Sequence, residues 1–215
     1  MKIPLGNFFS SLNPGAKLLI GLYLVGFPLF LAGHYSRAFE LYHWLGLSPL
    51  VWKSRPWSLL TYALLPNGIV DWVVSLFWLA TLVSVLGRNW RSSELLGFAV
   101  LTTLVGGIVA SFLNPPCLVA GNGAMVLGFL AAWYRLYGPE RLILLGIGEL
   151  SVRQAAIVVG LVELLILLFC LGWRVTLGLC CGGAIGWLYL SLRSKHALNR
   201  HSQVIDSERI ARLEL

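Results

Sequence analysis

The sequence predicts an all-α membrane protein in which six transmembrane helices form one bundle. Hydrophobic residues make up 58% of the 215-residue chain and charged residues only 12%, and the mean hydropathy is +0.80. A soluble domain carries about twice that share of charged residues. The apolar residues are also gathered into long runs, which cross a bilayer as helices.

The six spans follow from the positions of these apolar runs. The fourth run is short for a full crossing, which takes about 20 apolar residues, so we expect it to begin below the membrane surface. The non-helical stretch before it must then be shielded by protein or reach water. The predicted spans cover residues 17–33, 70–86, 95–113, 122–134, 155–171 and 176–192.

The remaining segments are short, so we expect one membrane domain over residues 17–195. It is flanked by a cytoplasmic N-terminal segment, 1–16, and a cytoplasmic tail, 196–215. The tail is polar and is expected to carry one short helix, over 207–213. The first loop, 34–69, interleaves aromatic with charged side chains, a composition that suits the headgroup region. We therefore predict that this loop lies in the outer interface.

Basic residues predict the orientation. Of the 16 lysines and arginines, 12 fall in segments on one side of the predicted spans and 4 on the other. Cytoplasmic loops carry the excess of basic residues, so both termini are predicted to be cytoplasmic. We expect a multi-pass protein of a bacterial inner (plasma) membrane.

Basic residues in the predicted cytoplasmic loops also account for the net charge of +7. This charge therefore gives no reason to expect nucleic acid as a partner. The four cysteines have no Cys-x-x-Cys spacing, and three of them lie in apolar runs. Small packing residues are the simpler interpretation of these cysteines. We therefore expect no metal site, no disulfide framework and no cofactor.

Two ridges of small residues are predicted to hold the bundle together. Residues four apart lie on one face of a helix, and small residues there let two backbones approach closely in a membrane. We therefore predict that the fourth and sixth spans pack on each other at the centre of the bundle. The two ridges are Ala120, Ala124, Gly128 and Ala132 in the fourth span, and Gly178, Gly182 and Gly186 in the sixth.

The start of the fourth span resembles the rhomboid family of intramembrane proteases. Residues 121–128, which begin Gly-Asn-Gly-Ala and end in Gly128, are similar to the family's Gly-x-Ser-Gly-Ala-x-x-Gly region. Residues 55–62, 159–165 and 182–190 are similar to other family segments, so the resemblance covers roughly residues 17–195. It implies a six-helix rhomboid-like bundle with an interfacial first loop and a groove for a partner's transmembrane segment.

The residues that supply peptidase chemistry in that family differ here. A rhomboid protease needs a serine nucleophile and a histidine base within hydrogen-bond reach. By the resemblance, Asn122 stands at the serine position, and Leu179, or Cys180 after one shift, stands at the histidine position. The family's oxyanion side chains fall on Asp71 and Ser75, and an ionised Asp71 would repel a developing oxyanion. The four histidines lie outside the predicted spans, at 34, 43, 196 and 201.

Three polar residues keep two interpretations each. Asn122 either caps its helix or forms a polar hook for a client's backbone. Asp71 either suits the positive end of a helix or contacts a partner. Glu163 lies within the fifth span, where an acidic residue is a functional candidate. It makes either a structural hydrogen bond inside the bundle or a contact with a proton or a client.

The combined interpretation is a non-proteolytic pseudoprotease that binds transmembrane helices of other membrane proteins, with lipid as its other contact. Assembly, chaperoning and a permanent place in a larger membrane complex are all compatible with this function. By resemblance, the client approaches between the second and fifth spans. Two alternatives stay open: a divergent active rhomboid protease, and a small transporter or channel, which the absence of an obvious inverted repeat disfavours. The predicted client-facing residues are Trp72, Phe77, Trp78 and Glu163.

Overall fold

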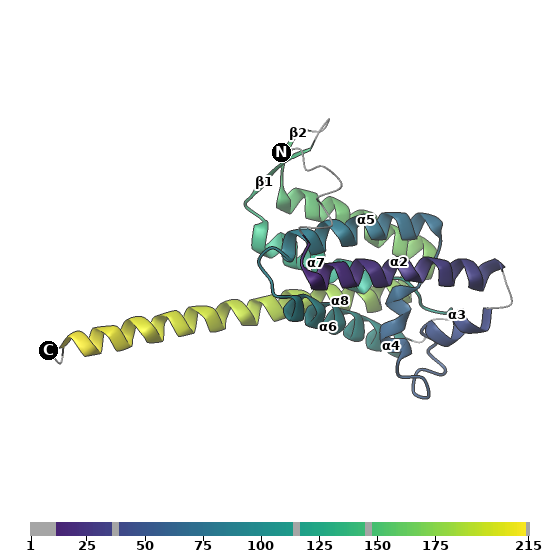
Figure 1. The fold of residues 1–215 in the computed structure, drawn as a ribbon, viewed down its shortest axis with the longest axis horizontal. Helices are drawn as coiled ribbons and strands as arrows, with labels where there is room; N and C mark the ends of the chain where they lie inside the picture. The colour runs from purple at the N-terminus through teal and green to yellow at the C-terminus, as the bar shows by residue number, and fades with distance from the viewer. Residues whose placement is uncertain (1–11, 36–38, 114–116, 145–147, 214–215) are drawn as a thin grey trace.

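The structure, a computed structural model, is a bundle of helices that lie side by side (Figure 1). It describes residues 12–35, 39–113, 117–144 and 148–213, so most of the predicted N-terminal segment lies outside the described residues. The main helices are α2 (Pro14–Tyr35), α5 (Ile69–Leu86), α6 (Ser92–Phe112), α7 (Gly123–Tyr137) and α8 (Val152–Leu213).

The six predicted apolar runs lie in these helices to within one residue at their ends, and the fifth and sixth runs both belong to α8. Within the described ranges, four helices are long and apolar enough to cross a membrane. The window in α8 spans 42 residues, enough for two passes. The 15 residues of α7 fall short of a full crossing, as the short fourth run led us to expect.

Helix α8 is divided at Gly172, whose backbone has φ of 80° and ψ of 167°. A continuous helix would separate Leu167 from Gly182 by roughly 22 Å, at about 1.5 Å per residue. Instead both lie against the start of α7. A β-carbon at Gly123 would lie 2.9 Å from Leu167 Cδ1, and one at Gly182 would lie 2.8 Å from Ala124 Cβ. The chain therefore folds back at Gly172, and we call residues 152–171 α8N and residues 173–213 α8C.

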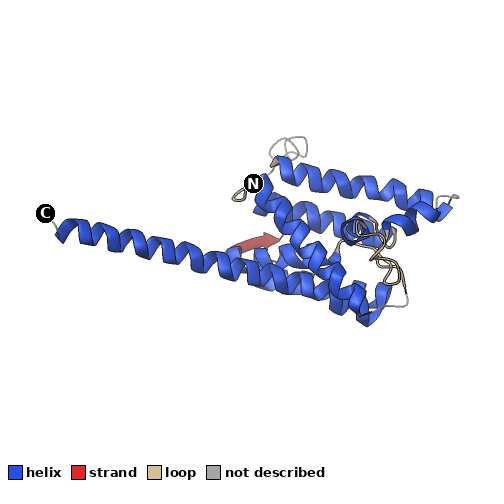
Figure 2. Cartoon of the chain, turned by 90° about the horizontal axis from the view of Figure 1, so that it is seen from below, coloured by secondary structure: helices blue, strands red, loops and turns tan. Residues whose placement is uncertain are grey.

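The C-terminal part of α8C leaves the bundle as one long projecting helix (Figures 1 and 2). The expectation of one short, separate helix over 207–213 is therefore wrong, because these residues continue the long helix. Apolar runs predict which part of a helix is buried, but they do not predict the residue at which the helix ends. Residues 193–213 contain no glycine or proline, so nothing in them interrupts the helix.

The first loop folds into short helices at the end of the bundle opposite the projecting helix (Figure 1). They are α3 (Phe39–Leu45), α4 (Ser58–Thr61) and the 3₁₀ turn η1 (Tyr62–Leu64). Thr61 Oγ1 donates to the carbonyl of Leu45 at 2.6 Å, and the buried Tyr62 hydroxyl donates to the carbonyl of Thr103 in α6 at 2.9 Å. These bonds attach the loop to the bundle.

A two-stranded antiparallel hairpin, which the apolar runs did not indicate, connects α7 to α8. Strand β1 (Arg141–Leu144) pairs with β2 (Gly148–Ser151), and Arg141 stands opposite Ser151. Helix α8 then begins with a capping box. The backbone N–H of Gln154 donates to Ser151 Oγ at 3.3 Å, and the N–H of Ser151 donates to Gln154 Oε1 at 3.1 Å.

Buried apolar side chains form two clusters. The first apolar cluster lies toward the hairpin end and draws on α2, α5, α6, α7 and both halves of α8. The second lies toward the short helices and joins the first loop to α7 and α8. The first includes Tyr23, Leu79, Phe98, Phe129, Val159 and Leu190, and the second includes Leu47, Tyr62, Val119, Ala124, Leu167 and Leu179.

Small residues of three helices meet between these clusters. A β-carbon at Gly182 of α8C would lie 2.8 Å from Ala124 Cβ, and one at Gly186 would lie 3.2 Å from the Cα of Gly128, both in α7. Helix α6 completes the contact, since a β-carbon at Gly106 would lie 2.5 Å from Ala124 Cβ. The backbones of α6, α7 and α8C thus approach closely.

Three ridge residues differ in their surroundings from the others. Gly178 faces α6, where a β-carbon on it would lie 2.5 Å from the Cα of Ala110. Ala120 lies before α7, which begins at Gly123, so its predicted place on the helical ridge is wrong. Ala132 is fully buried in the first apolar cluster. The contact includes α6, which the ridge pattern alone did not indicate.

We predict that Gly182→Leu destabilises the protein, because the leucine would collide with backbone and side-chain atoms of α6 and α7. Overpacking of this kind costs about 1–3 kcal/mol, which should lower the unfolding temperature in detergent. Gly160→Leu in α8N is the matched control, since no heavy atom lies within 4 Å of a β-carbon there. Equal unfolding temperatures for Gly182→Leu and the wild type would contradict the close contact.

Candidate functional site

Polar side chains from four parts of the chain gather between the two apolar clusters. Glu163 of α8N lies between Val159 of the first cluster and Leu167 of the second, on one face of the helix. Asn122 and Glu163 are each only 1% exposed. We call this group the polar layer; its members, all buried, are Tyr23 of α2, Asp71 and Ser75 of α5, Asn122 before α7, and Glu163.

The segment before α7 carries Asn122 into the interior because its backbone is bonded to the first loop. Val119 and Leu47 exchange two backbone hydrogen bonds, of 2.8 and 3.0 Å. The N–H of Gly121 donates to the carbonyl of Tyr62 at 3.0 Å, and Asn67 Nδ2 donates to the carbonyl of Ala120 at 2.7 Å. These bonds satisfy backbone groups that lipid could not satisfy.

Gly121 is required for this path. Its φ is +105°, in the region that residues with a side chain rarely adopt. A β-carbon there would also lie 2.7 Å from Asn67 Nδ2, which already bonds the neighbouring carbonyl. Asp71 Oδ2 would be 3.8 Å from the same β-carbon. The glycine therefore lets the chain pass close to α5 and turn into α7.

Asn122 occupies the N-cap position of α7, with φ of −90° and ψ of 15°, but its side chain makes no capping hydrogen bond. Its Nδ2 and Oδ1 are both buried and have no hydrogen-bond partner in the described part of the chain. The capping interpretation of Asn122 is therefore wrong. A buried polar group without a partner costs about 1–3 kcal/mol, so this amide is held at a cost to stability.

Asp71 organises the entry to α5. Its Oδ2 accepts the backbone N–H of Asn67 at 3.1 Å, and its Oδ1 accepts the hydroxyl of Ser75, one turn later, at 3.4 Å. Asp71 lies in the first turn of α5, where a negative side chain is favourable. This geometry agrees with the capping interpretation of Asp71.

Glu163 and Tyr23 resemble Asn122 in lacking partners. Both carboxyl oxygens of Glu163 and the Tyr23 hydroxyl are buried without a hydrogen bond to the described residues, although the hydroxyl faces Ser75. Glu163 interacts electrostatically with Asp71 across the layer. The predicted structural hydrogen bond of Glu163 is thus not formed. Tyr23 was not predicted, although it is the only polar side chain in residues 18–33.

The two positions that correspond to the rhomboid histidine lie in α8C. Leu179 is fully buried and packs in the second apolar cluster with Ala124, two residues after Asn122. Cys180 is half-buried beside it. The residue of α8C that shares a cluster with the start of α7 at this point is therefore apolar.

The predicted client-facing residues do not form one surface. Phe77 is 60% exposed and meets the half-buried Trp78 edge-to-face, with ring centroids 5.0 Å apart. Trp72 instead stacks on Phe27 of α2 at 4.1 Å, and its Nε1 donates to the carbonyl of Tyr23 at 3.4 Å. Glu163 points inward. Of the four residues only Phe77 is exposed, because an indole N–H and a carboxyl group both favour polar surroundings inside the bundle; contact with a client stays a prediction for all four.

The polar layer can act chemically as a set of hydrogen-bond donors and acceptors. Among the described residues, no three His, Cys, Asp or Glu side chains gather as a metal site would require. The layer brings together two carboxyl groups, an amide and two hydroxyls. Its unpartnered atoms could bond a polar group that enters the bundle.

Two asparagine substitutions should separate a structural amide from a binding one. Asn67→Ala would leave the buried carbonyl of Ala120 without its donor, at a cost of about 1–3 kcal/mol. Asn122→Ala removes two polar atoms that have no hydrogen-bond partner among the described residues, so we predict an unfolding temperature equal to or above that of the wild type. Thermal unfolding in one detergent measures both variants. A loss for Asn122→Ala as large as for Asn67→Ala would contradict this assignment.

Comparison with known proteins places the chain in a family. A search of curated proteins finds no match. A family model described as eukaryotic integral membrane protein (DUF1751) matches residues 17–204, which include the whole predicted membrane domain. Because that family is eukaryotic, the expected location in a bacterial inner membrane is not supported. The chain is a multi-pass integral membrane protein and belongs to the family of eukaryotic integral membrane proteins (DUF1751).

Proposed function

We propose that this chain is a non-proteolytic, rhomboid-like membrane protein that binds the transmembrane segments of partner proteins. The observation that carries the proposal is the buried amide of Asn122, whose donor and acceptor atoms have no partner among the described residues. It stands where the resemblance to rhomboids puts the substrate pocket. A partner's backbone or polar side chain would supply the missing hydrogen bonds.

Six passes through the membrane form part of the proposal. Successive segments alternate in direction through α2, α5, α6, α7, α8N and α8C (Figure 1). Helix α2 begins, and α8C leaves the bundle, at the same end. The loop after α5 and the start of α8, at that end, carry Arg88, Arg91 and Arg153, while Lys53, Arg55 and Arg174 are at the other end. The positive-inside rule then puts the first end in the cytoplasm.

The identity of the buried polar groups supports the proposed absence of proteolysis. The amide of Asn122 is not a nucleophile for peptide bonds, and Leu179 offers no base. The carboxylate of Asp71 accepts hydrogen bonds from Asn67 and Ser75, so each of its oxygens already has a structural partner. In this proposal the polar layer contacts a client segment without cutting it.

A client segment would gain hydrogen bonds inside the bundle. Asn122, Glu163 and Tyr23 together present five buried polar atoms without partners in the described part of the chain. A hydrogen bond between helices in a membrane contributes about 0.6–2 kcal/mol. Several such bonds would bias association toward clients that carry polar groups within the membrane.

The outer face of α5 suggests the route by which a client segment would approach the polar layer. Val70, Val73 and Phe77 recur three and four residues apart and are each more than half exposed, whereas Asp71 and Ser75 point inward. Helix α5 packs mainly against α2 and α7. A client that lies along α5 would reach the polar layer between α5 and α8N.

A small transporter is the second candidate, favoured by the two buried carboxyl groups on α5 and α8N. Asp71 and Glu163 could pass a proton or a cation between them. Proton uptake by liposomes that contain the purified protein, lost in Glu163→Gln, would favour transport over client binding.

Photo-crosslinking tests the client site. We predict that a crosslinker at Phe77 captures a protein in native membranes, while one at Val100 of α6, 44% exposed, captures mainly lipid. Asn122→Ala should weaken the capture at Phe77, because it removes the hydrogen bonds offered to the client. The captured partner should keep its full length.

Three outcomes would contradict the proposal. Equal capture from positions 77 and 100 would remove the case for a site along α5. Capture at 77 that Asn122→Ala leaves unchanged would remove the polar layer from the interface. Cleaved partner fragments, formed only in the presence of this protein, would show that it is an active protease.

A further inference from the structure

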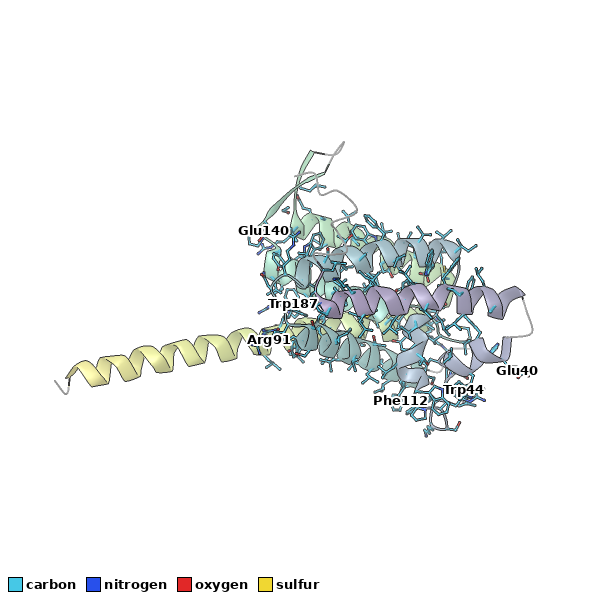
Figure 3. The ribbon with its side chains drawn as sticks, in the orientation of Figure 1. Glu40, Trp44, Arg91, Phe112, Glu140 and Trp187 are labelled. Carbon is cyan, nitrogen blue, oxygen red and sulfur yellow. The ribbon has the colours of Figure 1, made fainter. Side chains whose placement is uncertain are left out.

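An apolar groove lies between the two halves of α8, apart from the polar layer. Its volume is about 430 Å³, within the range of roughly 300–1,000 Å³ usual for ligand sites. Trp187, on its wall, lies toward the same end of the bundle as Arg91 and Glu140, opposite Trp44 and Phe112 (Figure 3). The groove is lined by Leu130, Ala131 and Tyr134 of α7, Ala156 and Ile157 of α8N, and Trp187 of α8C.

Two arginines stand beside this groove. The guanidinium of Arg135 lies over the ring of Trp187, with its Cζ 5.0 Å from the ring centroid. The guanidinium of Arg153 lies over the ring of Tyr134, 5.9 Å from its centroid. Both rings line the groove, Arg135 directly follows Tyr134, and Arg153 is one turn of α8N before Ile157. The two positive charges therefore flank the end of the groove that is nearer the hairpin.

The groove opens toward the surroundings of the bundle. Ile157 is 52% exposed and Trp187 is 41% exposed, so in a bilayer both side chains meet lipid chains. An arginine stacked on an aromatic ring keeps its donors in the fixed fork that binds phosphate oxygens. Basic pockets between transmembrane helices on the cytoplasmic side bind anionic lipid head groups. The apolar wall thus matches the acyl chain of an anionic lipid, and the two charges match its head group.

We infer that the groove between α8N and α8C binds an anionic phospholipid. An acyl chain lies along Ala131, Ile157 and Trp187, and the phosphate is held by Arg135 and Arg153. This lipid site is separate from the proposed client site, because Ala156 and Ile157 precede Glu163 by about two turns of α8N, roughly 10 Å toward the hairpin end. The two sites can therefore be tested independently.

The probes are phosphatidylglycerol and phosphatidylcholine with identical acyl chains, offered in equal amounts to the purified full-length protein. Native mass spectrometry then counts the lipid that the protein retains. Each arginine near an anionic surface adds about fivefold in affinity, so we expect phosphatidylglycerol to be preferred by up to about 30-fold. Equal retention of the two lipids by the wild type would overturn the inference, whatever the variants do.

Variants locate the site. Arg135→Gln and Arg153→Gln should each reduce the preference for phosphatidylglycerol by about fivefold. Arg174→Gln is the matched control, because its guanidinium also lies over a tryptophan ring, that of Trp173 at 5.4 Å, at the other end of the bundle. Ala131→Phe should reduce retention of both lipids by filling the groove without a change of charge. An equal effect of Arg174→Gln and Arg135→Gln would place the lipid elsewhere.

Discussion

The close approach of α6, α7 and α8C determines where the rest of the structure lies. Lipid tails are as apolar as leucine, so helices in a membrane associate through packing and hydrogen bonds, and small residues permit the tightest packing. Gly106, Ala124 and Gly182 provide that contact here. Because Ala124 is in the first turn of α7, the contact draws the beginning of that helix into the interior. The segment before it then needs protein partners, which Asn67 and Tyr62 supply.

The polar layer is a consequence of this arrangement. Asn122 precedes Ala124 by two residues, so the packing that buries the alanine also buries the amide. Asp71 accepts hydrogen bonds from Asn67 and Ser75. The side chains of Asn122, Glu163 and Tyr23 have no hydrogen-bond partner among the described residues. An apolar residue at any of these three positions would avoid the cost. Buried polar groups kept without partners are typical of sites that bind something.

Hydrophobic runs predicted where the helices lie, because burial in lipid requires long apolar segments. They did not predict the hairpin or the length of α8C, since a polar helix end and a short strand pair leave no apolar signal. Polar residues within apolar spans led to four members of the layer. Their bonding was not predictable, and neither was the direction of Trp72. Helix α5 is apolar on nearly every side, so its sequence carries little indication of which face meets α2.

If the polar layer is retained for binding at a cost to stability, removing its buried polar atoms should weaken binding without lowering stability. Glu163→Met, which keeps the length of the side chain and removes both carboxyl oxygens, separates the two effects when unfolding temperature and partner capture from position 77 are measured on the same preparation. Replacing a buried charged group by an apolar residue of similar volume is often neutral or stabilising. We expect an unfolding temperature at or above that of the wild type together with weaker capture. A lower unfolding temperature with unchanged capture would contradict it, because Glu163 would then be a structural residue.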